Sequence, residues 1–166
     1  MKQQDLSIAK EKISSGFKDL SLASNKLKSA ADDLFATISE LEKLLKSLNL
    51  RVSAWHQVAR SIDEDGTIRT RSIGYTNIDG QWVIAINKAV NDQVGEYNEE
   101  TWRFADAPLW MCADAISELP GLIQALLKRT VETTEKIKAK NQEAIEIVAA
   151  TAAVAAEIVT TTGRPK

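Results

Sequence analysis

The stretch YTNIDGQWVIAI, from Tyr75 to Ile86, places Asp79-Gly80 between two runs that are rich in β-branched and aromatic residues. An Asp-Gly pair in this setting is a strong signal for a two-residue hairpin turn, because such a turn needs positive φ angles. One face of the hairpin then carries Trp, Tyr and Ile and must be buried, while the other face is small and mostly polar. The expected cross-strand pairs are Asn77 with Trp82, Tyr75 with Ile84, and Ile73 with Ile86.

A further strand is expected on the N-terminal side of this hairpin. RVSAWHQVA, from Arg51 to Ala59, reads as a strand and is joined to the hairpin through the acidic turn DEDG. Together with the segment that follows, these strands predict a three- or four-stranded antiparallel β-meander with one face on helices. We assign this head to residues 50–106.

Residues 1–49 are expected to form one long helix, because Gln3 to Leu48 contains no Pro and only one Gly. At about 1.5 Å per residue it would reach roughly 65 Å. Counting by sevens gives an unbroken apolar row, which is strong evidence for a coiled-coil seam. The members of the row are Leu6, Ile13, Leu20, Leu27, Leu34, Leu41 and Leu48.

Residues 120–162 are expected to form a second long helix that stops at TTGRPK, where Gly163 and Pro165 break it. Its last third is rich in Ala and apolar over most of its circumference, so it needs more than one neighbour. Its apolar stripe passes two polar positions, Thr134 and Asn141. The members of the stripe are Ile123, Leu127, Thr130, Thr134, Ile137, Asn141, Ala144, Val148, Thr151, Ala155 and Ile158.

The two long helices are predicted to form an antiparallel hairpin, so that the fold is α+β with the β-meander inserted between the helices. The small residues near the start of the first helix would then meet the Ala-rich end of the second, and Leu41 to Leu48 would meet Ile123 to Leu127. Because the Ala-rich end needs further neighbours, we expect a homo-oligomer, a dimer or tetramer, most simply a dimer that forms a four-helix bundle. The alternative is a monomer with an exposed apolar stripe.

Residues 107–119 are expected to be a short elbow helix between the sheet and the second long helix. Asp106 stands where an N-cap is usual, with Pro108 in the first turn. Ser117 and Pro120 repeat this pattern at the start of the long helix. We therefore interpret these four residues as structural.

Three motifs resemble a group of uncharacterised bacterial proteins. They are IGY-x-x-x-DG-x-W (residues 73–82), W-x-F-x-D-A-P (residues 102–108) and L-P-x-L-I-x-A-L (residues 119–126). The resemblance covers roughly the middle 60 residues of the chain and implies a fold, but no activity. This chain departs from the group at Leu109, where the group has basic residues, and a shared basic site is therefore not implied.

Composition narrows the function classes. The chain has 166 residues, 21 basic against 23 acidic, and this balance argues against a general binder of nucleic acid or anionic membranes. A single Cys excludes an intrachain disulfide and fits a reducing cytoplasm. The N-terminus is charged and lacks the apolar region of a signal peptide. The most apolar run, Ala144 to Val159, is too short to span a membrane.

No nucleophile, phosphate-binding or metal motif is present in the sequence, so we expect no cofactor, no metal and no enzymatic activity. An enzyme would have to be built around His56, Asp106 and Cys112. For these we favour a packed or edge histidine, a helix cap and a buried small hydrophobe.

The sequence favours a non-enzymatic scaffold or protein-interaction module, with helices for self-association and a sheet head for partner contact. The alternative is a regulatory module that binds a small ligand or an anion on the sheet face, with Trp55, His56, Arg69 and Arg71 as candidate contacts. Trp55 is expected to point outward over the small residues of the sheet, which would make a shallow groove. The acidic loop 92–100 is either solvated or a docking surface.

Overall fold

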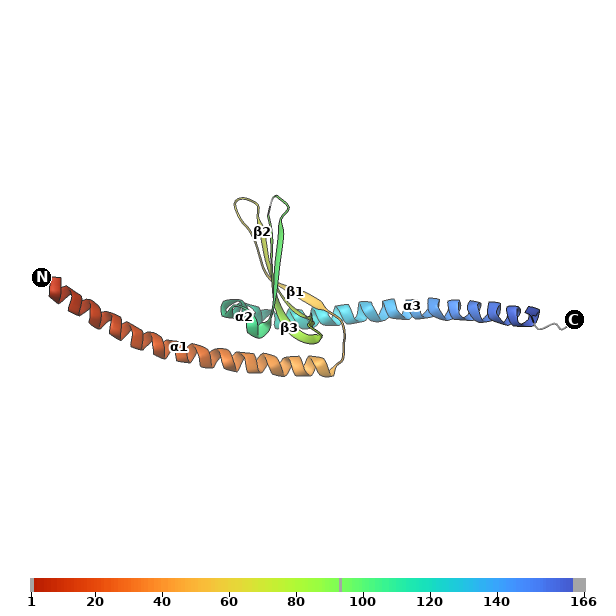
Figure 1. Ribbon diagram of the computed structural model, residues 1–166, viewed down its shortest axis with the longest axis horizontal. Helices are drawn as coiled ribbons and strands as arrows, with labels where there is room; N and C mark the ends of the chain where they lie inside the picture. Colours follow the sequence, from red (N-terminus) through yellow and green to blue (C-terminus); the bar gives the residue numbers. More distant parts are fainter. Residues whose placement is uncertain (1, 93, 163–166) are drawn as a thin grey trace.

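The computed structural model describes residues 2–92 and 94–162, with side chains described for 8–92 and 94–158. Two long helices flank a four-stranded sheet in chain order, and a short elbow joins the sheet to the second helix (Figure 1). The elements are α1 Lys2–Ser47, β1 Ala54–Ile62, β2 Ile68–Ile78, β3 Gln81–Asn91, β4 Tyr97–Arg103, the 3-10 turn η1 Phe104–Asp106, α2 Leu109–Ala115, the 3-10 turn η2 Ile116–Glu118, and α3 Leu119–Thr162. The α+β class and the antiparallel sheet are confirmed. The predicted break at Gly163 and Pro165 lies outside the described residues.

The sheet is a meander of four antiparallel strands in the order β1-β2-β3-β4. The register between β2 and β3 is the predicted one, with Tyr75 opposite Ile84 and Asn77 opposite Trp82. Asp79 and Gly80 have φ angles of 52° and 80°, and the Gly80 N–H donates to Asn77 Oδ1 (3.0 Å). Both turn residues therefore lie in the left-handed region that a tight hairpin turn requires.

One core joins the sheet to both long helices and to the elbow. The sheet contributes the Tyr and Ile side chains predicted to be buried, and α1 contributes Ile38 and Leu45 from its last turns. From α3, Leu122 and Leu126 are buried, whereas Ile123 and Leu127 are exposed. The stripe predicted for the start of α3 is therefore displaced by one residue from the face that packs in the core.

The predicted antiparallel helical hairpin is wrong within the chain. Both long helices run in the same direction, with the N-terminus at one end of the molecule and the C-terminus at the other (Figure 1). α1 contacts β3 and η1, while α3 contacts β1 and β2. From the segment Leu41 to Leu48, Leu45 is buried in the core beneath the sheet, whereas Ile123 and Leu127 of α3 are exposed. The physical reason is the elbow, which carries the chain across the sheet before α3 begins.

The elbow differs in detail from the predicted caps. Asp106 ends the turn η1, and Pro108 itself occupies the N-cap position of α2 without a side-chain cap hydrogen bond. Ser117 lies inside η2, and its Oγ donates to the carbonyl of Asp114 (3.4 Å) instead of accepting from a helix N–H. Pro120 is the second residue of α3, which is where a missing N–H does no harm.

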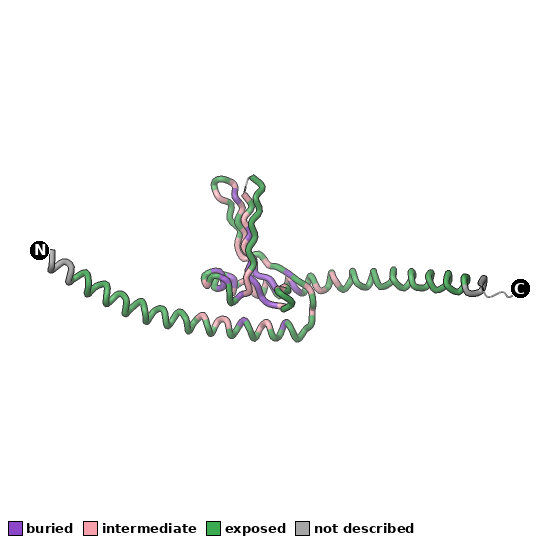
Figure 2. The backbone as a smooth tube through the Cα atoms, in the orientation of Figure 1, coloured by how far each residue is buried: buried purple, intermediate pink, exposed green. Residues whose placement is uncertain are grey.

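Long parts of both helices project beyond the head. In α1 every described side chain from residue 8 to residue 30 is exposed, and in α3 the same holds from residue 134 to residue 158 (Figure 2). We call residues 2–30 the α1 overhang and residues 134–162 the α3 overhang. In the described part of the chain, neither overhang nor any other helix is long and apolar enough to cross a bilayer.

Candidate functional site

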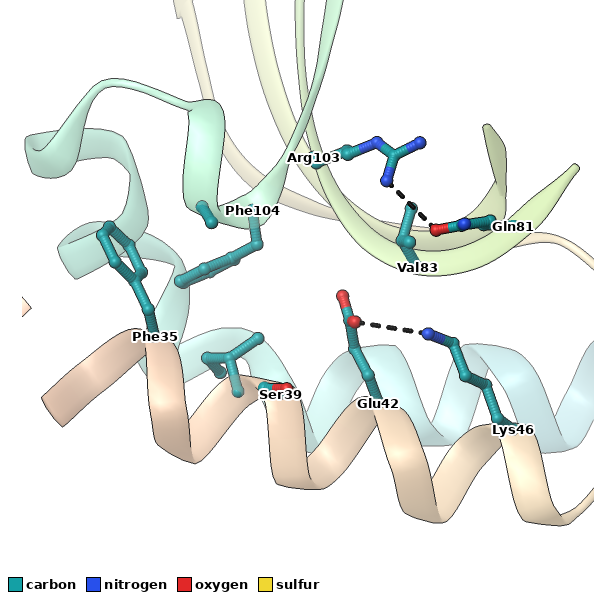
Figure 3. A pocket seen from close by; sticks show the side chains of 10 residues that line it. Phe35, Ser39, Glu42, Lys46, Gln81, Val83, Arg103 and Phe104 are labelled. Atoms are coloured by element: carbon teal, nitrogen blue, oxygen red, sulfur yellow. Dashed lines mark hydrogen bonds and ion pairs between the residues drawn. The ribbon is translucent and has the colours of Figure 1, made fainter. Parts of the chain in front are cut away.

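The edge of β3 is completed by a side chain from α1. β4 ends at Arg103, opposite Ala85, so the preceding residues of β3 have no strand beside them on that edge. The Ile84 N–H donates instead to Glu42 Oε1 (2.8 Å). Lys46 Nζ lies 3.7 Å from the other carboxylate oxygen of Glu42 (Figure 3). A buried N–H without an acceptor is costly, so Glu42 fixes where α1 can sit on the sheet.

A cavity of about 220 Å³ lies between α1 and β3 beside this contact. Phe35 of α1 and Phe104 of η1 form part of its apolar wall and meet edge to face, with ring centroids 6.3 Å apart. Across the cavity, Arg103 Nη1 donates to Gln81 Oε1 (3.2 Å) (Figure 3). Glu42 pairs with Lys46, and Arg103 is held by Gln81 and by Asp79, so each charged side chain that lines the cavity has a partner, which suits a structural joint.

A second cavity, of about 310 Å³, adjoins the end of α1 and shares Lys46 and Gln81 with the first. Trp82 and Tyr75 line it, and their rings stack with centroids 5.5 Å apart. Burial, with a smaller effect from the Glu42 carboxylate, raises the pKa of the Tyr75 hydroxyl. Tyr75 is therefore suited to packing and not to proton transfer.

His56 lies at the joint between β1 and α3. Its Nε2–H donates to Glu118 Oε2 (3.1 Å). The ring rests on Gly121, where an added Cβ would lie only 2.3 Å from Nε2. The structure therefore gives His56 a packing role at this joint, where only a glycine leaves room for the ring.

Trp55 lies on the opposite face of the sheet, over Gly74, where an added Cβ would approach the indole to 2.2 Å. The side chain is 39% exposed. It forms one wall of an open groove of about 440 Å³, whose other wall comes from α3 and includes Lys128 and Arg129. The groove beside Trp55 exists, but α3 contributes charged residues to it that the strand pattern could not indicate.

Arg69 and Arg71 lie on the helix-facing side of β2, so they do not join Trp55 in one site. Arg71 Nη1 donates to Asp114 Oδ2 (2.7 Å), and its guanidinium lies 4.8 Å from the ring centroid of Trp110. Arg69 Nε donates to Asp63 Oδ2 (2.7 Å). These cations line a cavity of about 200 Å³, together with Arg60, Lys88 and Trp110.

Cys112 and Asp106 belong to the elbow. The Cys112 thiol is fully buried, and its Sγ donates to the carbonyl of Phe104 (3.1 Å). Burial raises the pKa of this thiol, which disfavours the nucleophilic thiolate. Asp106 is exposed at the end of η1. Within residues 2–92 and 94–162, no group of three His, Cys, Asp or Glu side chains is placed to hold a metal ion.

The acidic segment from Asp92 to Glu100 is only partly a loop, because β4 begins at Tyr97. Asp92 Oδ1 accepts from the Glu96 N–H (2.8 Å) and closes the turn. The Tyr97 hydroxyl donates to Glu99 Oε2 (2.8 Å), and this hydrogen bond raises the pKa of Tyr97. Part of the acidic charge is therefore used to hold the turn and the edge strand.

No family model, no curated protein and no solved structure matches this chain. The resemblance drawn from the three sequence motifs remains a prediction. The features that bear on function are the joints at Glu42 and His56, the groove beside Trp55, the cation-lined cavity at Trp110, and the two overhangs.

Proposed function

We propose that this chain is a non-enzymatic scaffold or protein-interaction module, in which the long helices carry self-association and the sheet head contacts a partner. One observation carries the proposal: both overhangs expose large apolar side chains along most of their length. Among them, Leu20 is 63% exposed, Leu27 is 58% exposed and Val148 is 67% exposed.

Physical chemistry argues against leaving these side chains in water. Burial of apolar surface contributes about 25 cal/mol per Å², and contiguous apolar surface of this extent on a soluble chain marks an interaction site. Helices in proteins derive most of their stability from packing of an apolar face, and not from intrinsic propensity. Projecting helices with regular apolar rows are therefore suited to association with other helices.

The groove beside Trp55 is our candidate for partner contact. Trp and Arg are enriched among the residues that dominate binding energy at protein interfaces, and here Trp55 and Arg129 line the same groove. Lys128 and Glu132 add charged groups that could select a partner by electrostatic complementarity. The groove adjoins the start of the α3 overhang, because Glu132 lies just before residue 134, while its Trp55 wall belongs to the sheet head.

The test is light scattering coupled to size-exclusion chromatography, over concentrations from micromolar to millimolar. We expect the wild-type chain to exceed the monomer mass, and Leu20→Asp to shift it toward the monomer. Ser15→Asp is the matched control, because it adds the same charge about 140° away around α1 and should leave the mass unchanged. A wild-type chain that stays monomeric throughout would refute the proposal.

A second candidate function is anion or small-ligand binding at the cavity beside Trp110. The observation that favours it is three basic residues on the helix-facing side of the sheet, Arg69, Arg71 and Lys88, which line one cavity with the Trp110 ring. Arg69 and Arg71 also pair with Asp63 and Asp114, so Lys88 is the cation offered to a ligand. Thermal-shift measurements with phosphate, sulfate and nucleotides test it. A shift that Lys88→Gln abolishes and Lys136→Gln preserves would support it, and an unchanged melting temperature with every anion would exclude it.

A further inference from the structure

We infer that two copies of the chain exchange their overhangs, so that the α1 overhang of each copy pairs antiparallel with the α3 overhang of the other. This inference rests on the proposed self-association and names its geometry. It replaces the intrachain hairpin with the same antiparallel contact formed between chains.

The directions of the helices permit this arrangement. Both helices run the same way, and their overhangs lie at opposite ends of the molecule, so the two overhangs cannot meet within one chain (Figure 1). A two-fold axis perpendicular to the long dimension brings the α1 overhang of one copy beside the α3 overhang of the other, with opposite directions. The same operation forms the second pair, and the assembly closes as a dimer.

The two overhangs match in length. Residues 2–30 and residues 134–162 each span 29 residues. At about 1.5 Å per residue, each extends roughly 44 Å from the head. Over the described residues, the two overhangs can therefore pair along their whole length in the exchanged dimer.

The side chains on the two overhangs are complementary in size. The α1 overhang carries large exposed side chains on its seam, among them Ile13 and Leu20. With the midpoints of the overhangs opposed, Ile13 faces Thr151 and Leu20 faces Ala144. The far end of α3 instead has a shallow apolar groove of about 410 Å³, lined by Ala150, Thr151, Val154, Ala155 and Ile158. Large side chains opposite small ones interdigitate, whereas two Ala-rich faces leave space between them.

Charge also favours the antiparallel exchange. From Lys2 to Lys18 the α1 overhang has four Lys against two acidic residues, while from Asn141 to Thr162 the α3 overhang has three Glu and no basic residue. Antiparallel pairing sets these two ends side by side and also aligns the helix dipoles favourably. Pairing of α1 with the α1 of another copy in parallel would instead oppose like charges.

Disulfide trapping in the full-length chain tests the exchange. If the midpoints of the overhangs face each other, Leu20 of one copy lies opposite Ala144 of the other. We expect co-expressed Leu20→Cys and Ala144→Cys chains to form a disulfide-linked species of twice the chain mass upon oxidation. Ile137→Cys and Thr151→Cys replace Ala144→Cys to test registers one heptad away. Ser15→Cys replaces Leu20→Cys as the control, because it faces away from the seam.

The outcomes separate the two proposals. A mixed disulfide at any of the three α3 positions, absent with the Ser15→Cys control, supports the exchange. A dimer in which Leu20→Cys chains instead link to each other, with no mixed species, overturns the exchange and leaves self-association standing. A wild-type chain that is monomeric by light scattering overturns both.

Discussion

The close contact between His56 and Gly121 predicts that Gly121→Ala lowers the free energy of unfolding, although Ala normally stabilises a helix relative to Gly. Gly121 is the third residue of α3 and lies within continuous helical backbone that η2 precedes. In a helix, Ala is normally more stable than Gly by about 0.5–1 kcal/mol. Here the Cβ of an alanine would lie 2.3 Å from His56 Nε2 and 2.5 Å from Cε1. Non-bonded heavy atoms attract at about 3.5–4.0 Å and repel strongly at these shorter distances, so the imidazole must move.

The size of the effect follows from what the ring loses. Forcing extra volume into a packed contact costs about 1–3 kcal/mol. If the imidazole swings out instead, it gives up its hydrogen bond to Glu118, which contributes about 0.5–1.5 kcal/mol. After the gain in helix propensity is subtracted, we expect Gly121→Ala to lower the free energy of unfolding by about 1 kcal/mol.

The sign should reverse when the ring is absent. In a His56→Ala chain the three atoms nearest to the new Cβ are gone, and the same Gly121→Ala change should stabilise by about 0.5–1 kcal/mol. The assay is urea denaturation followed by circular dichroism on the four chains of the double-mutant cycle, all at one protein concentration because the proposed self-association would contribute to stability. If Gly121→Ala stabilises the wild-type and His56→Ala chains equally, the steric argument is refuted.

Three further outcomes are expected. Gly74→Ala should lower the free energy of unfolding by about 1–3 kcal/mol, because its Cβ would overlap the Trp55 ring; an unchanged urea midpoint would contradict this. Glu42→Ala should cost about 1–3 kcal/mol by leaving the Ile84 N–H without an acceptor, whereas Glu42→Gln keeps an acceptor and should cost less; equal losses in urea denaturation would exclude that role. Cys112 should react with iodoacetamide only as fast as the chain opens, because it is buried and its pKa is raised; rapid labelling without denaturant would contradict this.

The central hairpin was predictable because its determinants are local. Asp79 and Gly80 supply the positive φ angles, and alternation along each strand supplies the buried face, so the register between Tyr75 and Ile84 follows from adjacent residues. No information about the rest of the chain is needed. The outward direction of Trp55 followed from the same alternation.

The packing face of α3 was not predictable in the same way. The run from Leu122 to Leu127 offers two neighbouring apolar rows, one through Leu122 and Leu126 and the other through Ile123 and Leu127. Both satisfy helical periodicity, and the position of β1 decides between them. The same limit applies to the candidate site, because the approach of Trp110 to Arg71 depends on where the elbow places α2.

Heptad periodicity also identifies which face of a helix needs a partner, but not which chain supplies it. Four antiparallel strands return the chain to the end of the sheet where it began, since Ala54 opens β1 and Arg103 closes β4 at that end. From there a direct helix could fold back along α1. The fifteen residues from Phe104 to Glu118 instead cross the sheet, and α3 starts on the far side and runs in the direction of α1 (Figure 1). Because of the elbow, the apolar faces of the α1 overhang and the α3 overhang lie at opposite ends of the molecule and cannot pair within one chain. A second copy related by a two-fold axis is the simplest partner that pairs with both overhangs at once.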